Sequence, residues 1–358
     1  MSSSTSNSES DQEAGARGRT AALRRLARCA GILLVLLLCF IGIELFTRIV
    51  LVPKSTDLRR LTSYPALAEQ LLQQNGFRIA LVGNSALEDG VDPEIVQEML
   101  KKAGIGPASV QSFYVEGTHI SNWYYIINHC FWRSANKPDL IVILFHYTNL
   151  CDARSPEIGR LSHYFTTTAD WEELLLQDTT SRSERIEIVL SQYWLSFAVR
   201  GRIQYRVLGA LVPGYMDFAQ EMRAAARDRE TKQPSAARSS ASYRMLERLL
   251  RRAREEHTPV LFVAFPPRDG TYELSDEVVK LIHREGMELL DMRSVPCLKP
   301  DMYKDWIHMT ERGRETFSPE LARKIAQLIG KYQTLNEGEF NATKNRCVEK
   351  HRTAGPKT

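Results

Sequence analysis

The sequence has little cysteine and no two cysteines in a CxxC arrangement. Its six cysteines are scattered over 358 residues, at positions 29, 39, 130, 151, 297 and 347. The histidines lack the HExxH spacing, so the chain shows none of the ligand patterns of a zinc site. We predict neither a metal nor an organic cofactor. One or two disulfides are compatible with a domain outside the cytoplasm, although sequence alone does not give their pairing.

An excess of charge of one sign is also missing. The formal net charge is +4, and the basic residues are mixed with acidic ones along the chain. Nucleic-acid-binding domains concentrate Lys and Arg on one face, interleaved with aromatic residues, and no such stripe occurs here. We therefore expect no nucleic-acid partner. The hydrophobic share of 43% and the charged share of 25% are those of an ordinary globular protein.

One long apolar run lies near the N-terminus. Residues 30–52 are long enough, at about 1.5 Å per residue, to cross the hydrocarbon layer of a membrane as one transmembrane helix. Residues 1–29 are polar and end in a basic cluster, which predicts a disordered cytoplasmic tail. Basic residues before the run and few after it predict that the following domain is extracytoplasmic. An uncleaved anchor is favoured over a signal peptide because no small-x-small cleavage site follows.

Two charged residues interrupt this apolar run. Glu44 and Arg48 are four positions apart, so on a helix they lie on one face and can pair near the far end of the span. Residues 53–75 are predicted to form a linker and a short amphipathic helix. At the other end of the chain, residues 336–358 are polar and are predicted to be a disordered tail.

Five short apolar runs alternate with helical patterns within the domain predicted over 76–335. They cover residues 78–83, 109–115, 139–145, 259–265 and 288–292. This alternation predicts an α/β fold with a mainly parallel sheet that is covered on both faces. Sites in such sheets form in the loops at the carboxyl ends of the strands. The final helix is expected to begin at a cap formed by Ser318 and Pro319.

The third and fourth runs are too far apart in sequence for a simple crossover. We therefore interpret residues 153–255 as a mostly helical insertion. Its first half is apolar and aromatic, and its second half is charged. Four interpretations stay open, namely a lid, a pair of helices on the membrane surface, a partner-docking element, or additional core helices.

Four weak signals, each after a predicted strand or before the last helix, occur in the order expected of a serine-dependent site. Ser85 comes two residues after the first run, where its hydroxyl is exposed and its backbone N–H can point at an oxyanion. Asp305 precedes His308 by three residues, so on one loop it can orient a base that takes the serine proton. Gly117 and Asn149 follow the second and third runs, where a backbone N–H and an amide can serve the same oxyanion.

The order Ser, Gly, Asn, His resembles that of the SGNH, or GDSL-type, hydrolase superfamily. The resemblance covers roughly residues 76–150 and 258–330. It is closest to membrane-anchored bacterial proteins that act as acyl esterases or O-acyltransferases on cell-surface polymers. It implies a three-layer, flavodoxin-like α/β/α sandwich. It also implies that Ser85 is the nucleophile, that His308 is the base and that Asp305 orients the base. The three oxyanion donors would be the Ser85 amide, Gly117 and Asn149.

Two positions depart from the family pattern. The third block usually reads Gly-x-Asn-Asp, whereas this chain has Tyr147-Thr148-Asn149-Leu150, so the Asn is kept and the Gly and Asp are not. Asp152 is the acid that would take up the missing role. The first block has Asn84 where many members have Asp.

The resemblance implies a bacterial inner-membrane protein with a periplasmic catalytic domain that acts on acyl esters of cell-surface carbohydrate. Its partners would be the membrane, which it crosses once, the acylated carbohydrate or another ester substrate, and a membrane-bound protein that donates the acyl group. The altered third block keeps an alternative open, which is a non-catalytic protein of the same fold that binds a surface glycan or a membrane partner. The sequence does not separate hydrolysis from transfer.

Overall fold

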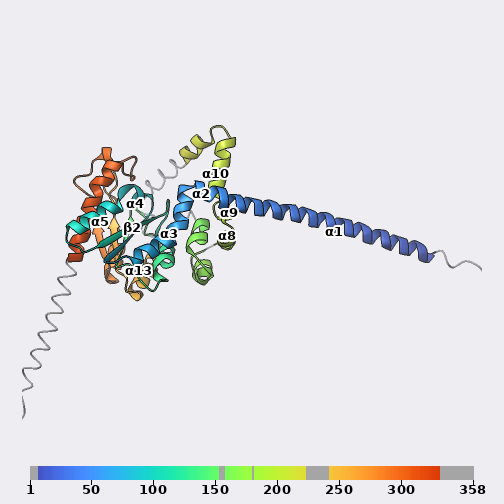
Figure 1. The fold of residues 1–358 in the computed structure, drawn as a ribbon, viewed down its shortest axis with the longest axis horizontal. Coiled ribbons are helices and arrows are strands. Elements are labelled where there is room, and N and C mark those ends of the chain that lie inside the picture. The colour runs from blue at the N-terminus through green and yellow to red at the C-terminus, as the bar shows by residue number, and fades with distance from the viewer. Residues whose placement is uncertain (1–6, 153–157, 180, 223–241, 331–358) are drawn as a thin grey trace, which may run out of the picture.

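A five-stranded sheet lies at the centre of the computed structural model, which describes residues 7–152, 158–179, 181–222 and 242–330 (Figure 1). Each strand agrees with its predicted run to within one residue at either end. The strands are β1 (Phe77–Gly83), β2 (Ala108–Tyr114), β3 (Leu140–Phe145), β4 (Val260–Ala264) and β5 (Glu288–Asp291).

The strands are all parallel and follow the order β2-β1-β3-β4-β5. Val82 of β1, for example, lies opposite Phe113 of β2 and Ile143 of β3. This is the flavodoxin-like order, in which the direction of strand addition reverses between β1 and β3. The predicted α/β fold is confirmed. Such folds bind ligands in the crevice at this reversal, just beyond the carboxyl ends of the strands.

Alternate residues of each strand face two separate hydrophobic cores. On β3, Ile141 and Ile143 belong to the first core, whereas Leu140 and Val142 belong to the second. Because both faces are buried, the strands are continuous apolar runs in the sequence. The first face is covered by α3 (Thr56–Gln73), α6 (Ile120–Ile127), α13 (Arg244–Glu255) and α14 (Asp276–Arg284). The second is covered by α4 (Ser85–Gly90), α5 (Pro93–Lys102) and the helix over 311–330.

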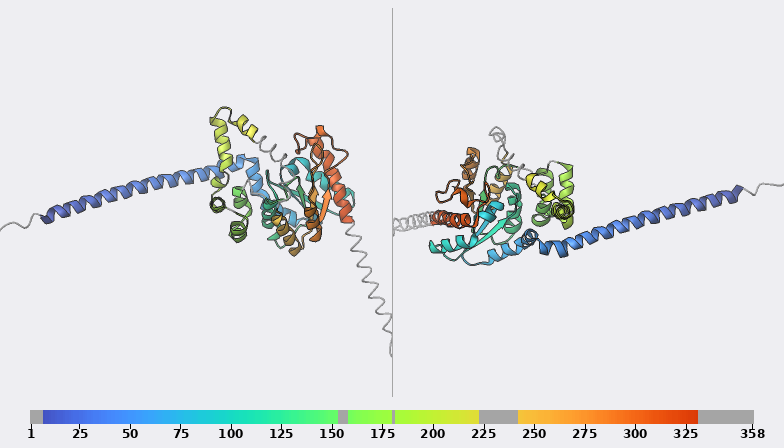
Figure 2. Two further views of the ribbon diagram at one scale, coloured as in Figure 1. Left: turned by 180° about the vertical axis from the view of Figure 1, so that it is seen from behind. Right: turned by 90° about the horizontal axis from the view of Figure 1, so that it is seen from above.

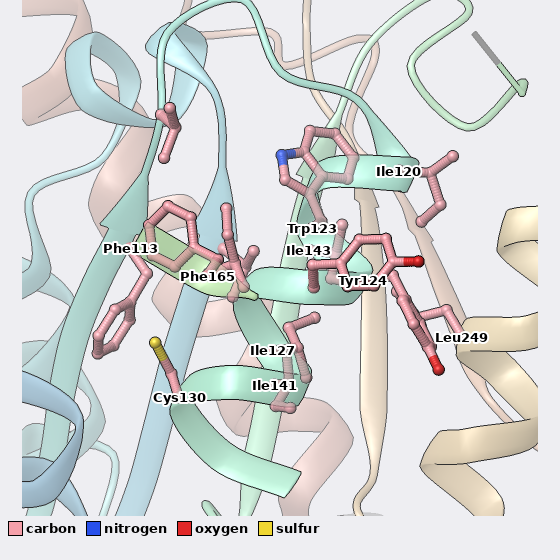
Figure 3. Close-up of a cluster of buried hydrophobic side chains, with 14 of the residues drawn as sticks. Phe113, Ile120, Trp123, Tyr124, Ile127, Cys130, Ile141, Ile143, Phe165 and Leu249 are labelled. Atoms are coloured by element: carbon pink, nitrogen blue, oxygen red, sulfur yellow. The ribbon is translucent and has the colours of Figure 1, made fainter. Parts of the chain in front are cut away.

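The first core contains many aromatic side chains among its aliphatic ones (Figure 3). Phe113 packs edge-to-face on Phe131, with ring centroids 5.0 Å apart, and both rings are fully buried. Phe131 belongs to a π-helical turn, Asn128–Trp132, that continues α6. Trp123 of α6 is also buried, and its Nε1 donates to Thr118 Oγ1 at 3.0 Å. This core therefore holds the loop that follows β2.

The N-terminal helix α1 (Asn7–Phe46) continues through a π-helical turn (Thr47–Leu51) into α2 (Val52–Lys54). Within the described residues, Leu26–Lys54 is the one helix long and apolar enough to cross a membrane. The predicted pair is present, since Arg48 Nε donates to Glu44 Oε1 at 2.7 Å. The structure differs from the predicted disordered tail, because α1 already begins at Asn7. The Ala, Glu, Arg and Leu residues there favour helix, and the span supplies a nucleus to extend.

The final helix begins earlier than predicted. It covers 311–330, so Ser318 and Pro319 lie inside it and the predicted cap is wrong. Ser318 Oγ instead donates to Arg314 O one turn earlier, at 2.7 Å, as serine can do inside a helix. It also accepts from Asp92 N at 2.8 Å, which ties the start of α5 to this helix. The tail predicted over 336–358 lies outside the described residues.

The described parts of the predicted insertion are helical. They are α7 (Ile158–Phe165), two short turns (Thr168–Asp170 and Glu172–Gln177), α8 (Arg182–Tyr193), α9 (Leu195–Ala198), α10 (Arg200–Leu211) and a helix over 215–222. α13 also falls in the predicted range but is the crossover helix that precedes β4. Its Leu246, Leu249 and Leu250 are fully buried in the first core. The insertion therefore ends before α13 rather than at 255.

Candidate active site

Ser85 is the first residue of α4, two positions past the end of β1. Asn84 caps this helix, because its Oδ1 accepts from Ala86 N at 3.0 Å. Gly83 lets the helix turn closely over the strand, since a Cβ there would lie 2.9 Å from the Leu87 Cβ. The N–H of a first helical residue has no intrahelical acceptor, so the Ser85 amide can donate to a bound group.

His308 lies in a tight loop between a short turn (Pro300–Met302) and the last helix. Tyr303 and Met309 pair across the loop in an antiparallel bridge, and Lys304 N donates to His308 O at 2.7 Å. Ile307 and Met309, the two neighbours of His308, are 1% and 0% exposed and pack in the second core. The loop is therefore anchored on both sides of the imidazole.

The three side chains predicted to be catalytic lie together. His308 Nε2 is 2.8 Å from Ser85 Oγ. His308 Nδ1 is 2.8 Å from Asp305 Oδ2 and 3.0 Å from Oδ1. This arrangement matches a nucleophile, base and acid triad, in which the carboxylate holds Nδ1–H and leaves Nε2 facing the hydroxyl.

Asp305 is fixed by the backbone of its own loop. Its Oδ1 accepts the N–H groups of Ile307 and His308, at 3.0 Å and 2.9 Å. Burial raises the pKa of the carboxyl, but these two bonds and the His308 ring outweigh burial and hold the pKa below its usual value. The carboxylate therefore stays ionised at neutral pH and stabilises the imidazolium that forms when His308 takes a proton.

Gly117 lies on the loop after β2 with a φ of +69°, a left-handed conformation that residues with a Cβ rarely adopt. The next residue anchors the loop. Thr118 Oγ1 donates to Val115 O at 2.6 Å, and the carbonyl of Thr118 accepts from Asn84 Nδ2 at 3.3 Å. The Gly117 backbone is thus held beside the loop that carries Ser85.

Asn149 is buried, and its amide has one orientation. Its Oδ1 accepts from His146 N at 3.0 Å and from Asn84 Nδ2 at 3.3 Å. The Nδ2 group therefore lies on the opposite side, 3.3 Å from His119 Nδ1. The same contacts explain Asn84, because an Asp at that position would set an acceptor against the acceptors Asn149 Oδ1 and Thr118 O.

Tyr147, at the position where the SGNH pattern has Gly, adopts a φ of +46°. This is the left-handed region, which costs a non-glycine residue roughly 1–2 kcal/mol. Packing of the ring offsets the strain. It stacks on Tyr272 with centroids 4.7 Å apart and lies edge-on to Trp306 at 5.2 Å. Because Trp306 lies between Asp305 and His308 in the chain, Tyr147 also supports the loop that carries His308.

Asp152 does not take up the role of the missing acid. Its carboxylate accepts from Arg244 N at 3.1 Å, Met245 N at 2.8 Å and Ser242 Oγ at 2.7 Å. It therefore satisfies the first N–H groups of α13. Asp152 is not among the described residues that line the pocket at Ser85. The hypothesis that it replaces the family's acid is wrong.

The triad opens into a pocket of about 760 Å³. One wall consists of the loops described above and includes Ser85, Gly117, Asn149 and His308. A second wall comes from the insertion and includes Val199, Arg202 and Tyr205. This second wall could not be predicted from the sequence, because no motif marks its residues and only tertiary packing brings them to the triad.

Ion pairs fix the second wall to the rest of the domain. Asp57 of α3 pairs with Arg160 of α7 at 2.8 Å and with Arg202 of α10 at 3.1 Å. Arg202 also pairs with Glu116, the neighbour of Gly117, at 2.9 Å. Burial raises the pKa of Glu116, but the hydrogen bond and charge of Arg202 lower it below its usual value. Glu116 is therefore ionised, and the insertion is tied to the loop that carries Gly117.

Metal ligands and disulfides are not found in the part of the chain that the structure describes. No three His, Cys, Asp or Glu residues there are grouped so that they could hold a metal ion. The described cysteines form no disulfide, and Cys151, next to Asp152, lines a separate pocket.

No family model matches the chain, and no curated protein matches it. Among solved structures, it is similar to an alpha/beta hydrolase enzyme from the metagenome of Lake Arreo, Spain, with 12% identity over 70% of this chain and 96% of that one, at a TM-score of 0.34. It is also similar to an acetyl xylan esterase, with 13% identity over 70% of this chain and 99% of that one, at a TM-score of 0.33. A gut microbial diltiazem-metabolizing enzyme matches with 13% identity over 72% of this chain and 47% of that one, at a TM-score of 0.31.

Proposed function

We propose that this protein is a serine esterase or O-acyltransferase of the SGNH type. The observation that carries the proposal is the continuous line of contacts from Asp305 through His308 to Ser85, with distances of 2.8 Å at both steps. An imidazole held in this way can remove the serine proton as the hydroxyl attacks a carbonyl. The pocket around Ser85 also contains the groups that the family uses as oxyanion donors.

The chemistry proceeds in two balanced steps. In the first, Ser85 Oγ bonds to the acyl carbon of an ester, His308 takes the hydroxyl proton, and the negative oxygen rests on the Ser85 amide, Gly117 N–H and Asn149. His308 then gives the proton to the leaving alcohol, and the acyl-enzyme remains. In the second step, water or a sugar hydroxyl attacks this acyl group, its proton passes through His308, and Ser85 is released.

The setting we propose is the bacterial inner membrane, with α1 as the anchor and the catalytic domain in the periplasm. The apolar helix Leu26–Lys54 and the basic residues before it support this orientation. The substrate class that we propose is acyl esters of cell-surface carbohydrate. The open pocket, with charged and aromatic groups such as Arg202, Glu88 and Trp306 on its walls, supports a polar acceptor of this kind. A membrane-bound acyl donor protein would supply the acyl group.

A fluorophosphonate probe tests the nucleophile. We expect the purified full-length protein to be labelled covalently, and Ser85→Ala to lose the label. Ser183→Ala is the matched control, because Ser183 is an exposed serine on α8, away from the pocket, and should label fully. Labelling that persists in Ser85→Ala would overturn the assignment.

Product analysis separates hydrolysis from transfer. The protein is supplied with an acetyl donor, with and without a polysaccharide acceptor, and free acetate and acetylated polysaccharide are measured. Acetate alone indicates an esterase, and acceptor-dependent acetylation indicates a transferase. A folded protein that neither labels nor turns over any donor would favour the non-catalytic alternative.

A further inference from the structure

An unusual contact lies inside the apolar helix. Glu44 accepts the backbone N–H groups of Leu195 and Ser196, at 3.2 Å and 2.9 Å, in addition to its pair with Arg48. Leu195 and Ser196 are the first two residues of α9, whose N–H groups have no intrahelical acceptor. Glu44 therefore acts as the cap of a helix that belongs to the insertion.

This contact fixes the level of α9 along the helix axis. Glu44 precedes Val52, the last residue of the apolar run, by eight positions, which is about 12 Å at the rise of an α-helix. Trp194, just before α9, packs on Phe40 of α1 with ring centroids 4.7 Å apart, and Phe40 lies one turn deeper still. When residues 30–52 cross a bilayer, α9 and Trp194 are consequently level with the outer leaflet, not above it.

The segment from α8 to the helix over 215–222, which we call the arm, extends from this point. In Figures 1 and 2, α10 lies beside the C-terminal end of α1 and runs across its direction. α10 has no buried residue of its own. The second helix packs on it at Gly209, where a Cβ would lie 2.7 Å from Met216 Sδ. The rings of Tyr205 and Tyr215 also pack together, with centroids 6.1 Å apart.

The arm leaves many large apolar side chains uncovered. Leu211 is 74% exposed and Phe218 is 58% exposed. Further exposed apolar residues of the arm are Ile186, Tyr193, Trp194, Val207, Val212, Met216 and Met222. Soluble proteins rarely expose clusters of this kind to water, and Trp and Tyr are enriched at membrane–water boundaries.

We infer that the arm lies in the outer leaflet of the bilayer beside α1 as an interfacial element. The occupant of its apolar surface is lipid, because the capping contact at Glu44 sets the arm at the depth of the leaflet. The arm also explains how the span accommodates a carboxylate, since Glu44 faces helix N–H groups and Arg48 instead of lipid. This inference rests on α1 crossing the membrane, as proposed above.

The position of the arm also affects the pocket. Tyr205 of α10 lines the pocket and packs on the second helix of the arm, and Val199 and Arg202 line the same wall. An arm seated in the leaflet therefore holds one wall of the catalytic pocket at the membrane surface. The substrate that reaches Ser85 from this side is one presented at the bilayer, such as an acyl group carried by a membrane component.

Depth-dependent fluorescence quenching of the full-length protein in liposomes tests the inference. Single cysteines replace Leu211 and Phe218 and are labelled with the fluorophore NBD, in a background that lacks the native exposed cysteines. Lipids with a nitroxide at acyl carbon 5 act as quencher, and soluble iodide reports contact with water. We expect several-fold stronger lipid quenching at both positions than at Lys101→Cys, an exposed site on α5, on the far side of the domain from α1 (Figure 1).

Leu36→Cys, inside the apolar run, separates the two proposals. Lipid quenching at position 36 with iodide quenching at 211 and 218 would mean that α1 inserts and the arm does not, which overturns the inference alone. Iodide quenching at all three positions would overturn the anchor as well. Protection from both quenchers at 211 and 218 would show that protein, such as a second copy of this chain, covers the arm, and this also contradicts lipid contact.

Discussion

The carboxyl edge of the sheet around Asn84, Ser85, Gly117 and Asn149, which we call the rim, differs from the arm in which groups it leaves exposed. At the rim, several polar side chains are buried and hydrogen-bonded. Asn84 and Asn149, for example, are each 4% exposed and bond to each other. On the arm, apolar side chains such as Leu211 and Phe218 project outward. One chain thus contains a region whose polar groups are fixed by hydrogen bonds and a region whose apolar surface is unsuited to water.

The difference indicates what each region is adapted to. Donors at the rim are fixed before a substrate arrives, which is what stabilises charge that develops during a reaction. The most exposed side chains of the arm, such as Leu211 and Phe218, bury little surface in the fold, so they would be stabilised by apolar surroundings. The ion pairs from Asp57 to Arg160 and Arg202 join the two regions at the pocket.

The largest effect should come from removing a rim donor. We expect Asn149→Ala to lower turnover of an ester substrate by about 100- to 1,000-fold, because one oxyanion donor is typically worth that much. Asn149→Asp is the control, since it keeps an acceptor for His146 N but loses the Nδ2 donor. It should preserve stability better than the alanine variant and remain nearly inactive. Turnover of Asn149→Ala within threefold of the wild type would contradict the role.

A smaller effect should appear in the pH dependence of stability. Burial, together with the charges of His119 and His308, lowers the pKa of His146 to about 3. The pKa of a histidine in an unfolded chain is about 6.5. Below that pH, residue 146 therefore binds a proton in the unfolded chain but not in the folded one. The free energy of unfolding should therefore fall as pH drops from about 6.5 toward 3.

The slope from one such group is at most about 1.4 kcal/mol per pH unit, and solvent in the pocket reduces it. Urea denaturation in detergent at pH 7 and pH 5 measures it. In His146→Gln the pH dependence should be smaller by this amount. An unchanged slope in the variant would show that His146 does not titrate as predicted.

The smallest effect should be the change in unfolding free energy when an exposed side chain of the arm is shortened and the protein is measured in detergent. Leu211→Ala removes a side chain that is 74% exposed, and its change in unfolding free energy should stay within about 0.5 kcal/mol. Leu249→Ala is the matched control, because Leu249 is fully buried in the first core and its loss should cost about 2–5 kcal/mol. Equal costs at the two positions would mean that the arm packs on protein.

Local features were enough to predict the sheet and most of the rim. Strands buried on both faces must be apolar throughout, so their runs stand out in the sequence. Ser85, Gly117 and Asn149 each follow a strand, and parallel strands bring their carboxyl ends to one edge. The pair Glu44 and Arg48 was predictable because helix periodicity places residues four apart on one face.

Other features depended on contacts between distant residues and could not be predicted. Asp152 caps α13 some 90 residues later, at Arg244, and Ser318 bonds to Asp92 N across 226 positions. Local motifs suggested an active-site acid and a helix cap at these two positions, because the competing partners are invisible in the local sequence. The left-handed backbone of Tyr147 is similar, since the rings of Tyr272 and Trp306 that compensate for it are remote.

The sequence by itself determined the parallel α/β sheet, an apolar helix long enough to span a membrane, and the identity of the groups at the rim, because periodicity and position after a strand are local properties. Only the tertiary structure decided that His308 meets Ser85, that Asp57 ties the insertion to the pocket, and that Glu44 caps α9. Each of these contacts joins residues more than 40 positions apart. Their formation depends on how the helices pack on the sheet and on one another, which no local pattern specifies.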